Sequence, residues 1–515
     1  MTASADPSAW PLSSQTLGAA FTAACALRGP ADFLVDDGTR LNGIETAERT
    51  EWIAAALHAD GLLVGHRIAF LSRPSVSHTL TWFSAIRLGC VATNLHLLET
   101  EQRLAETITW LEAGLVIHDG EFADLAASLA SHCPRVTFIA LEEIVSTDIK
   151  RPTPPLDAGA PHDPVAIVLS SGSTGRPKGV VHTNASTVAS ISAGIDVYCG
   201  IDTSDSVLVC IGTSFGGWCN VVIPFAGAGT KLVFQRRFEP QAFLNGLQNE
   251  KITIAPLVPT MWRMALAAQP ENYDLSRVKL AFMSGEMANR ADVQDIQRRI
   301  TKRVRAAHLS TEGACGCGVV LDEDAFLDGG TQPAGQPLGG VSVRIVAETR
   351  EIDQPLPHGV IGEILLRGTS LASGYWKDDN RTAARFQNGW WRSGDTGYLT
   401  SDNKLVVVGR TDHVINSGGV KIQAEDIEAG LMQHPHVRQA AVVGVRDAKW
   451  GQRAEAFVVT STDIDEGAIA AWCQTQQQLA PMKFLKAIHI VERLPTGPTG
   501  KLYRPALLSN KEGSP

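Results

Sequence analysis

The stretch VLSSGSTGRPKGVVHTN, residues 168–184, is the most informative part of this sequence. An apolar run leads into a loop of serine, threonine and glycine, and Lys178 follows. Glycines allow a close backbone approach, hydroxyls donate hydrogen bonds to oxyanions and a lysine adds positive charge, so the pattern predicts a phosphate-binding loop after a strand. It is not a Walker A sequence, because Gly179 stands where that motif has Ser or Thr. The residues predicted to bind phosphate are Ser170, Ser171, Gly172, Ser173, Thr174, Gly175 and Lys178.

The surrounding sequence predicts an α/β fold. Helical patterns alternate with short apolar runs over about 15–150 and again up to about 330, as in a sheet of parallel strands covered by helices. Short β-runs separated by turn residues over 335–410 indicate an antiparallel or β-barrel-like subdomain. We therefore predict a large N-terminal α/β domain, residues 1–411, and a small C-terminal α+β domain, residues 412–515.

Composition and charge narrow the class of protein. The 515 residues carry 45 basic and 54 acidic side chains, so the formal charge of 45 − 54 = −9 argues against a nucleic-acid-binding protein. The nine cysteines are scattered and lack zinc spacing, and the N-terminus lacks the pattern of a secretory signal, so we expect a cytoplasmic protein. The uncharged stretch 206–230 is broken by glycines and Pro224, which argues against a membrane span.

Six motifs in a fixed order resemble those of the adenylate-forming superfamily, which includes acyl-CoA synthetases, adenylation domains of peptide synthetases and luciferases. The resemblance covers nearly the whole chain. The motifs are SSGSTGRPKG (170–179), LSTEG (309–313), GYWKDD (374–379), WWRSGDTGYL (390–399), GRTDHVINSGGVKI (409–422) and PTGPTGKLYR (495–504).

The resemblance implies an acid–thiol ligase that uses ATP, Mg²⁺ and coenzyme A. A carboxylate attacks the α-phosphate of ATP and releases pyrophosphate, and a thiol then displaces AMP from the acyl-adenylate. Lys501 resembles the lysine that bridges the acid and the α-phosphate. Asp395 resembles the carboxylate that accepts both ribose hydroxyls, and Arg410 would contact the ribose or a phosphate.

Magnesium and adenine would be held by the second motif. Thr311 and Glu312 occupy the position of the family's Mg²⁺-binding pair, and Thr174 is expected to assist. His308 and Leu309 depart from the Tyr-Gly that usually precedes this pair. His308 would still stack on adenine, whereas Leu309 favours a smaller or differently shaped acid.

The resemblance also implies a hinge and an acid pocket. Asp412 resembles the residue about which the C-terminal domain rotates, bringing first Lys501 and then the Gly418–Gly419 slot for pantetheine to the site. The residues expected to line the acid pocket are Phe215, Trp218, Ser284, Gly285 and Leu309. For Trp218, a place in the packed core is an equal alternative.

Several alternatives stay open at this stage. A stand-alone adenylation enzyme that loads a carrier protein would share the same motifs, as would a nucleotide-binding pseudoenzyme. A serine hydrolase using Ser214 is suggested by Gly212-Thr213-Ser214-Phe215-Gly216, with Asp395 and His413 as partners, but leaves the other motifs unexplained. Aryl, short-chain and medium-chain acids all remain candidates. A homodimer is expected only because dimers are common among enzymes.

Overall fold

The computed structural model describes residues 15–146, 154–170, 177–214, 216–285, 290–322, 334–347, 352–417, 420–447, 449–475, 485–496 and 502–509. The chain divides into two compact units. The first unit comprises Met1–Ser342 and Leu366–Trp391, and the second comprises Val343–Leu365 and Arg392–Pro515.

One sheet of the first unit carries the predicted phosphate loop. Its strands run in the order β18-β8-β7-β4-β3-β5-β6, parallel from β7 to β6 and antiparallel at β8 and β18. The bounds are β3 Arg67–Leu71, β4 Val91–Asn94, β5 Leu115–His118, β6 Thr137–Ala140, β7 Pro164–Ser170, β8 Lys178–Thr183 and β18 Gly374–Tyr375.

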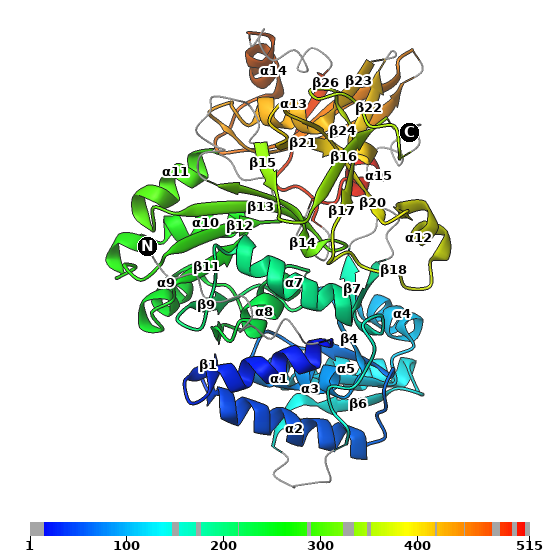
Figure 1. The fold of residues 1–515 in the computed structure, drawn as a ribbon. Coiled ribbons are helices and arrows are strands. Elements are labelled where there is room, and N and C mark those ends of the chain that lie inside the picture. Colours follow the sequence, from blue (N-terminus) through cyan, green and yellow to red (C-terminus); the bar gives the residue numbers. More distant parts are fainter. Residues whose placement is uncertain are drawn as a thin grey trace. The chain divides into compact units, whose positions relative to one another are not determined.

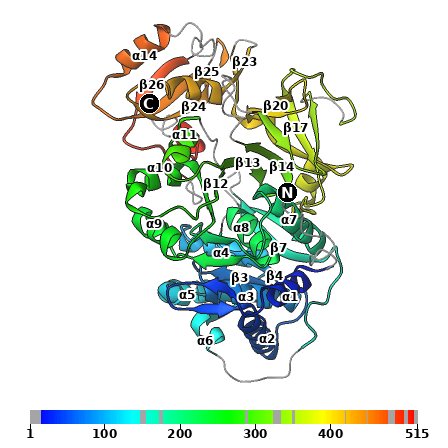
Figure 2. The same cartoon turned by 60° about the vertical axis from the view of Figure 1, so that its left-hand side comes forward.

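Both faces of this sheet are covered by helices, as Figures 1 and 2 show. Along β3, Ile68 and Phe70 belong to the same core cluster as residues of α1, α2, α3 and α6, whereas Ala69 and Leu71 pack with α4 and α5. Successive side chains of a strand point to opposite faces of the sheet. A strand covered by helices on both faces therefore needs a continuous run of apolar residues. The bounds are α1 Leu17–Arg28, α2 Gly43–Ala59, α3 Val76–Arg87, α4 Glu101–Leu111, α5 Ala123–His132 and α6 Leu141–Val145.

A second sheet of this unit is built in the same way. Its strands run β2-β1-β10-β9-β11-β12-β13-β14-β15, parallel from β1 to β13. Helices α7 and α8 share one core cluster with it, and α9, α10 and α11 share another. The strands are β1 Asp32–Val35, β2 Arg40–Asn42, β9 Ser206–Val209, β10 Lys231–Phe234, β11 Ile254–Leu257, β12 Leu280–Ser284, β13 Val304–Ser310, β14 Ala314–Asp322 and β15 Ala334–Pro337. The helices are α7 Asn184–Val197, α8 Gly216–Gly227, α9 Pro240–Asn249, α10 Pro259–Ala267 and α11 Arg290–Arg299.

Helix α8 contains a proline that frees one carbonyl in the core. Pro224 has no N–H to donate to the carbonyl of Asn220, four residues earlier. That carbonyl instead accepts hydrogen bonds from the Tyr198 hydroxyl and the Cys315 thiol, both at 3.1 Å. The stretch 206–230, apart from residue 215, therefore forms strand β9, a turn and the buried helix α8. Within the described part of the chain, no helix has both the length and the hydropathy needed to cross a bilayer.

The second unit contains the strands predicted as a barrel-like subdomain, in the order β16-β17-β20-β21, and a C-terminal α+β part. In the latter, β22 pairs with β23 and β25, β25 pairs with β24, and β26 joins β25 in parallel. The strands are β16 Ser342–Val346, β17 Gly362–Arg367, β20 Trp390–Leu399, β21 Leu405–Arg410, β22 Val414–Ser417, β23 Val420–Gln423, β24 Val437–Asp447, β25 Gly451–Thr460 and β26 Leu485–Ile490. Helices α13 Ala424–Leu431, α14 Glu466–Thr475 and α15 Pro505–Ser509 complete it, and the first unit adds α12 Asp379–Arg385 and β19 Phe386–Gln387.

The predicted α/β class with a separate C-terminal part is confirmed. The division by compactness places both sides of the predicted boundary, residues 411 and 412, in the second unit. That boundary, and the mobility attached to it, stay predictions.

Candidate active site

The turn between β13 and β14 carries Thr311 and Glu312 and is held by its neighbours. The imidazole of His182, on β8, places Nε2 2.8 Å from the Thr311 carbonyl. Burial lowers the pKa of His182, so the ring is neutral and Nε2 carries its proton toward that carbonyl. The amide of Ala372 donates to the Glu312 carbonyl at 2.8 Å, and the Gly313 amide donates to the hydroxyl of Ser310 at the same distance.

The residues around this turn come from four of the six motifs. The Glu312 side chain is buried, and its Oε1 accepts a hydrogen bond of 2.9 Å from the Tyr375 hydroxyl on β18. Lys178 Nζ, at the start of β8, lies 3.7 Å from the same oxygen and 5.8 Å from the centre of the Tyr375 ring. Behind them, Trp391 Nε1 lies 3.5 Å from the Tyr375 hydroxyl. A cation and a carboxylate therefore meet where the predicted phosphate loop rejoins the sheet.

Tyr375 is a candidate site residue that the sequence analysis did not single out. It lies in the quoted motif GYWKDD but was assigned no role. Burial, and then the negative charge of Glu312, raise the pKa of Tyr375. The phenol therefore keeps its proton at neutral pH and serves as a fixed donor to the carboxylate. His182 was missed as well, although its place five residues after the loop was a usable signal.

The oxygen ligands that this site offers fit a magnesium ion bound together with a nucleotide. The described part of the chain has no group of three or more His, Cys, Asp or Glu side chains placed to hold a metal ion. Magnesium in nucleotide sites is held by one or two carboxylates together with substrate phosphates. The buried carboxylate of Glu312, with Lys178 beside it, agrees with that pattern.

Asp395 and Arg410 form an ion pair within the second unit. They face each other directly across β20 and β21, and Arg410 Nη1 lies 2.9 Å from Asp395 Oδ1. Arg410 Nε lies 3.1 Å from Asp412 Oδ1 in the turn that follows. Burial opposes the charged form of Arg410, but the two carboxylates outweigh it and raise its pKa. The same arginine lowers the pKa of Asp412 against the effect of burial.

The residues predicted for the acid pocket are placed in different surroundings. Trp218 is fully buried and packs edge-on against His78 and Trp82, with ring centres 5.1 and 5.6 Å apart, so the structure favours the core alternative. Leu309 is partly buried against the same core cluster. Ser284 ends β12, and Gly285 follows with a φ of 88°, which suits glycine. The side chain of His308, at the end of β13, is partly buried.

A small cavity lies beside Thr311 and has a volume of about 20 Å³. Its walls come from β7, β8, α7, α8 and the β13–β14 turn, and include His182, Gly216, Cys219, Asn220, Thr311 and Ala314. None of the described residues predicted for the acid pocket lines it. Three of these residues, Gly216, Cys219 and Asn220, lie close to Phe215 and Trp218 in sequence, and this proximity was the signal for that part of the wall.

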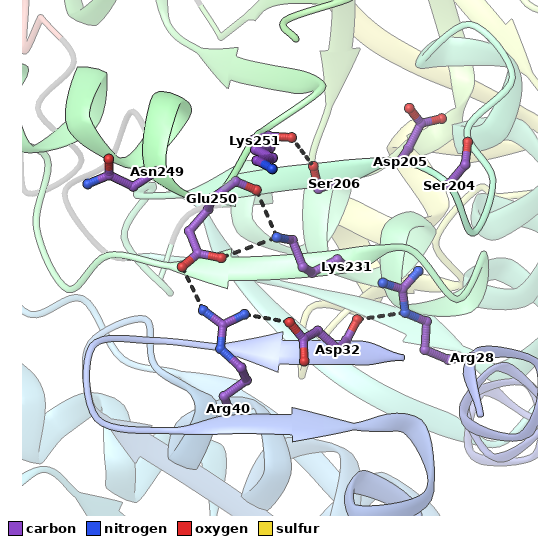
Figure 3. Close-up of a pocket in the computed structure, with 10 residues that line it drawn as sticks. All are labelled: Arg28, Asp32, Arg40, Ser204, Asp205, Ser206, Lys231, Asn249, Glu250 and Lys251. Carbon is purple, nitrogen blue, oxygen red and sulfur yellow. Dashed lines mark hydrogen bonds and ion pairs between the residues drawn. The ribbon is translucent and has the colours of Figure 1, made fainter. Parts of the chain in front are cut away.

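A wider depression of about 430 Å³ lies elsewhere in the first unit (Figure 3). Its charged groups pair with one another: Arg40 contacts Asp32 at 2.5 Å and Glu250 at 2.7 Å, and Lys231 lies 3.2 Å from Glu250. Residues of the six motifs do not line it. The motif residues therefore gather at the Lys178–Glu312 region and not at this depression.

Some predicted site residues lie outside the described residues: Ser171, Gly172, Ser173, Thr174, Gly175, Phe215, Gly418, Gly419 and Lys501. Ser170 ends β7. Ser214 lies between β9 and α8, the strand-to-helix position of a nucleophile elbow, but it is buried. A nucleophile elbow exposes its serine, so this geometry does not favour the hydrolase alternative.

Comparison with known proteins assigns the chain to a family. The family model described as AMP-binding enzyme matches residues 21–376, and the AMP-binding enzyme C-terminal domain matches residues 426–501. The chain belongs to the AMP-binding enzyme family. The predicted membership of the adenylate-forming superfamily, and with it the predicted class of AMP-forming ligase, is confirmed.

Particular relatives are CoA ligases. The chain is 30% identical over 475 residues to a feruloyl-CoA synthase of Amycolatopsis sp, covering 91% of this chain and 93% of that protein. It is 28% identical to an indoleacetate–CoA ligase of Aromatoleum aromaticum, covering 90% and 92%. Among solved structures, o-succinylbenzoate CoA synthetase (MenE) of Bacillus subtilis, in complex with ATP and magnesium ion, has a TM-score of 0.84 at 22% identity, covering 95% and 98%. Amide bond synthetase McbA of Marinactinospora thermotolerans has a TM-score of 0.85 at 22% identity, covering the same shares.

Proposed function

We propose that the chain is an ATP-dependent carboxylic acid:CoA ligase that forms an acyl-adenylate and then an acyl-CoA, with release of pyrophosphate and AMP. The observation that carries the proposal is the cluster of Lys178, Glu312 and Tyr375, which joins three motifs at the end of the predicted phosphate loop. The family membership and the CoA-ligase relatives support it.

Adenylation brings an anionic carboxylate to a polyanion, so fixed positive charge is its main requirement. Lys178 supplies such a charge from β8, and we propose that Lys501 supplies the second, at the reacting carboxylate. Glu312 would hold Mg²⁺, with Thr311 and Thr174, and Tyr375 keeps that carboxylate oriented. Mg²⁺, when bound with ATP, neutralises phosphate charge. Asp395 would accept the ribose hydroxyls, with Arg410 paired to its carboxylate.

In the second step, thioester formation, a thiol must reach the acyl-adenylate at the place where Lys501 served adenylation. We propose that the chain turns about Asp412 between the steps, and that the Gly418–Gly419 slot admits the pantetheine arm of CoA. A carrier protein is the alternative acceptor. Eight described cysteines are free thiols, which agrees with the proposed cytoplasmic setting.

The acid that we propose is aromatic or otherwise compact. The relatives are named for feruloyl, indoleacetate, 2-succinylbenzoate and 4-coumarate acids, each of which carries a ring. Leu309, which stands where the family usually has glycine, favours a compact shape.

Pyrophosphate exchange across a panel of aryl, short-chain and medium-chain acids tests the first half-reaction. We expect exchange with at least one aryl acid, and absence of exchange with every acid would contradict the proposal. Release of AMP when CoA is added without a carrier protein tests the second half. If exchange is present but CoA releases no AMP, the carrier-protein alternative replaces the CoA ligase.

A further inference from the structure

The chain on both sides of Lys501 is anchored within the second unit. Thr496 and Leu502 form an isolated β-bridge, and the Tyr503 amide donates to the Pro495 carbonyl at 2.8 Å. Helix α15 begins at Pro505, and its Leu507 is buried in a cluster with residues of β24 and β25. Arg504 directly precedes this helix and lies three positions after the lysine.

Arg504 makes a partly buried ion pair with helix α13. Its Nη2 lies 2.7 and 2.9 Å from the two carboxylate oxygens of Glu428, and the two side chains are 18% and 15% exposed. The Val442 amide on β24 donates to the same carboxylate at 2.7 Å. Burial raises the pKa of Glu428, and the Arg504 charge works against that shift. Removing one partner of such a pair leaves the other charge buried, so the contact holds the chain firmly.

The same helix reaches the predicted hinge turn. Glu425 lies one turn before Glu428 on α13, and its Oε1 lies 2.6 Å from Nδ1 of His413, which directly follows Asp412. Arg504 Nη2 lies 4.0 Å from this oxygen as well. A continuous series of charged contacts therefore runs from the segment after Lys501, through α13, to the hinge turn.

We propose that Arg504 is a positioning residue for Lys501: its ion pair with Glu428 fixes residues 502–509, which directly follow the lysine, to the helix that also contacts the hinge turn. The lysine then enters the adenylation site in one geometry whenever the hinge takes the adenylation orientation. An arginine suits this task, because its planar guanidinium holds a carboxylate in a defined direction. The inference rests on the proposed function, since it requires that Lys501 serve adenylation.

The test separates the two half-reactions in the full-length protein. Arg504→Gln is compared with wild type in pyrophosphate exchange, using the acid that exchanges fastest in the panel, and in thioesterification of its supplied acyl-adenylate. A displacement of about 1 Å in a catalytic group can lower the reaction rate by about 100-fold. We expect kcat for adenylation to fall by about that factor, KM for ATP to stay unchanged, and thioesterification to persist. Glu428→Gln should give the same profile, and the double variant should be no worse than either single one.

A matched control is present in the same unit. Arg453 Nε lies 2.8 Å from Oε1 of Glu455, whose side chain is fully buried. Arg453→Gln therefore breaks a similar ion pair, but this pair does not join residues 502–509 to α13. We expect this control to keep the ratio of the two half-reactions. If Arg504→Gln does not fold, Arg504→Lys, which keeps the charge but loses the planar fork, should show the same selective loss in smaller degree.

The outcomes separate this inference from the proposed function. Equal losses in both half-reactions, or no loss in either, would overturn the positioning role of Arg504. Lys501→Ala is measured alongside. If that variant keeps full exchange, the proposed role of the lysine itself fails. If it loses exchange while Arg504→Gln does not, only the present inference fails.

Discussion

Replacing Tyr375 with phenylalanine removes one hydroxyl from the candidate site and leaves the ring in place. In the wild type that hydroxyl donates to Glu312 at 2.9 Å, and both side chains are buried. The raised pKa of Tyr375 keeps the donor protonated across the neutral range. A hydrogen bond to a charged group contributes about 1.5–3 kcal/mol, which corresponds to about 10- to 150-fold in an equilibrium constant.

The loss should appear in the binding of magnesium ATP. Without the phenol, Lys178 at 3.7 Å remains beside Glu312, but the carboxylate is no longer held in one direction. We expect Tyr375→Phe to raise KM for magnesium ATP by about 10- to 150-fold, with a smaller fall in kcat at saturation. Pyrophosphate exchange, titrated with magnesium ATP at a fixed excess of acid, measures both constants.

Tyr273→Phe provides the control. It also removes one phenolic hydroxyl, but the Tyr273 ring packs against a core cluster of the first unit that does not contain Tyr375. It should leave both constants unchanged. Thermal denaturation shows whether the Tyr375→Phe protein is folded. If the folded variant has the wild-type KM for magnesium ATP, Tyr375 does not orient Glu312 for magnesium ATP binding. Equal losses in the two tyrosine variants would refute the same role.

Three further predictions concern catalysis, the hinge and the core. Lys501→Ala should slow acyl-adenylate formation by about 10²–10³-fold and spare thioesterification of a supplied acyl-adenylate; single-turnover measurements that find equal loss would count against a lysine serving one orientation. Asp412→Pro should restrict the hinge backbone and impair thioester formation more than adenylation, and the same measurements would dismiss the hinge if both steps slowed alike. Tyr198→Phe should leave the Asn220 carbonyl with one donor, the weakly donating Cys315 thiol. The free energy of unfolding should therefore fall by about 1–3 kcal/mol, and an unchanged midpoint of urea denaturation would contradict this account.

Much of the fold was predictable because its signals are local. The apolar runs of β3 and β7 and the apolar face of α13 lie within short stretches, where periodicity reports burial directly. The motifs are contiguous too, so their order along the chain was enough to predict the superfamily. In residues 206–230, the glycine and proline positions argued against a membrane span, but they did not predict the helix Gly216–Gly227.

The partners of the site residues could not be predicted in this way. Glu312 and Tyr375 are 63 residues apart, and His182 and Thr311 are 129 apart. Nothing in the local pattern around Trp218 distinguishes a pocket aromatic from a core aromatic, and its contacts with His78 and Trp82 come from a helix far away in sequence.

The amino-acid sequence by itself determined the superfamily, the alternation of helices and strands, and the residue types available for binding ATP. Tertiary structure alone decided which of these side chains meet: Tyr375 with Glu312, His182 with the turn beside it, and Arg504 with Glu428. The physical reason is that backbone periodicity is a property of neighbouring residues. Hydrogen bonds and ion pairs form wherever packing brings two groups within about 3 Å, whatever their separation along the chain.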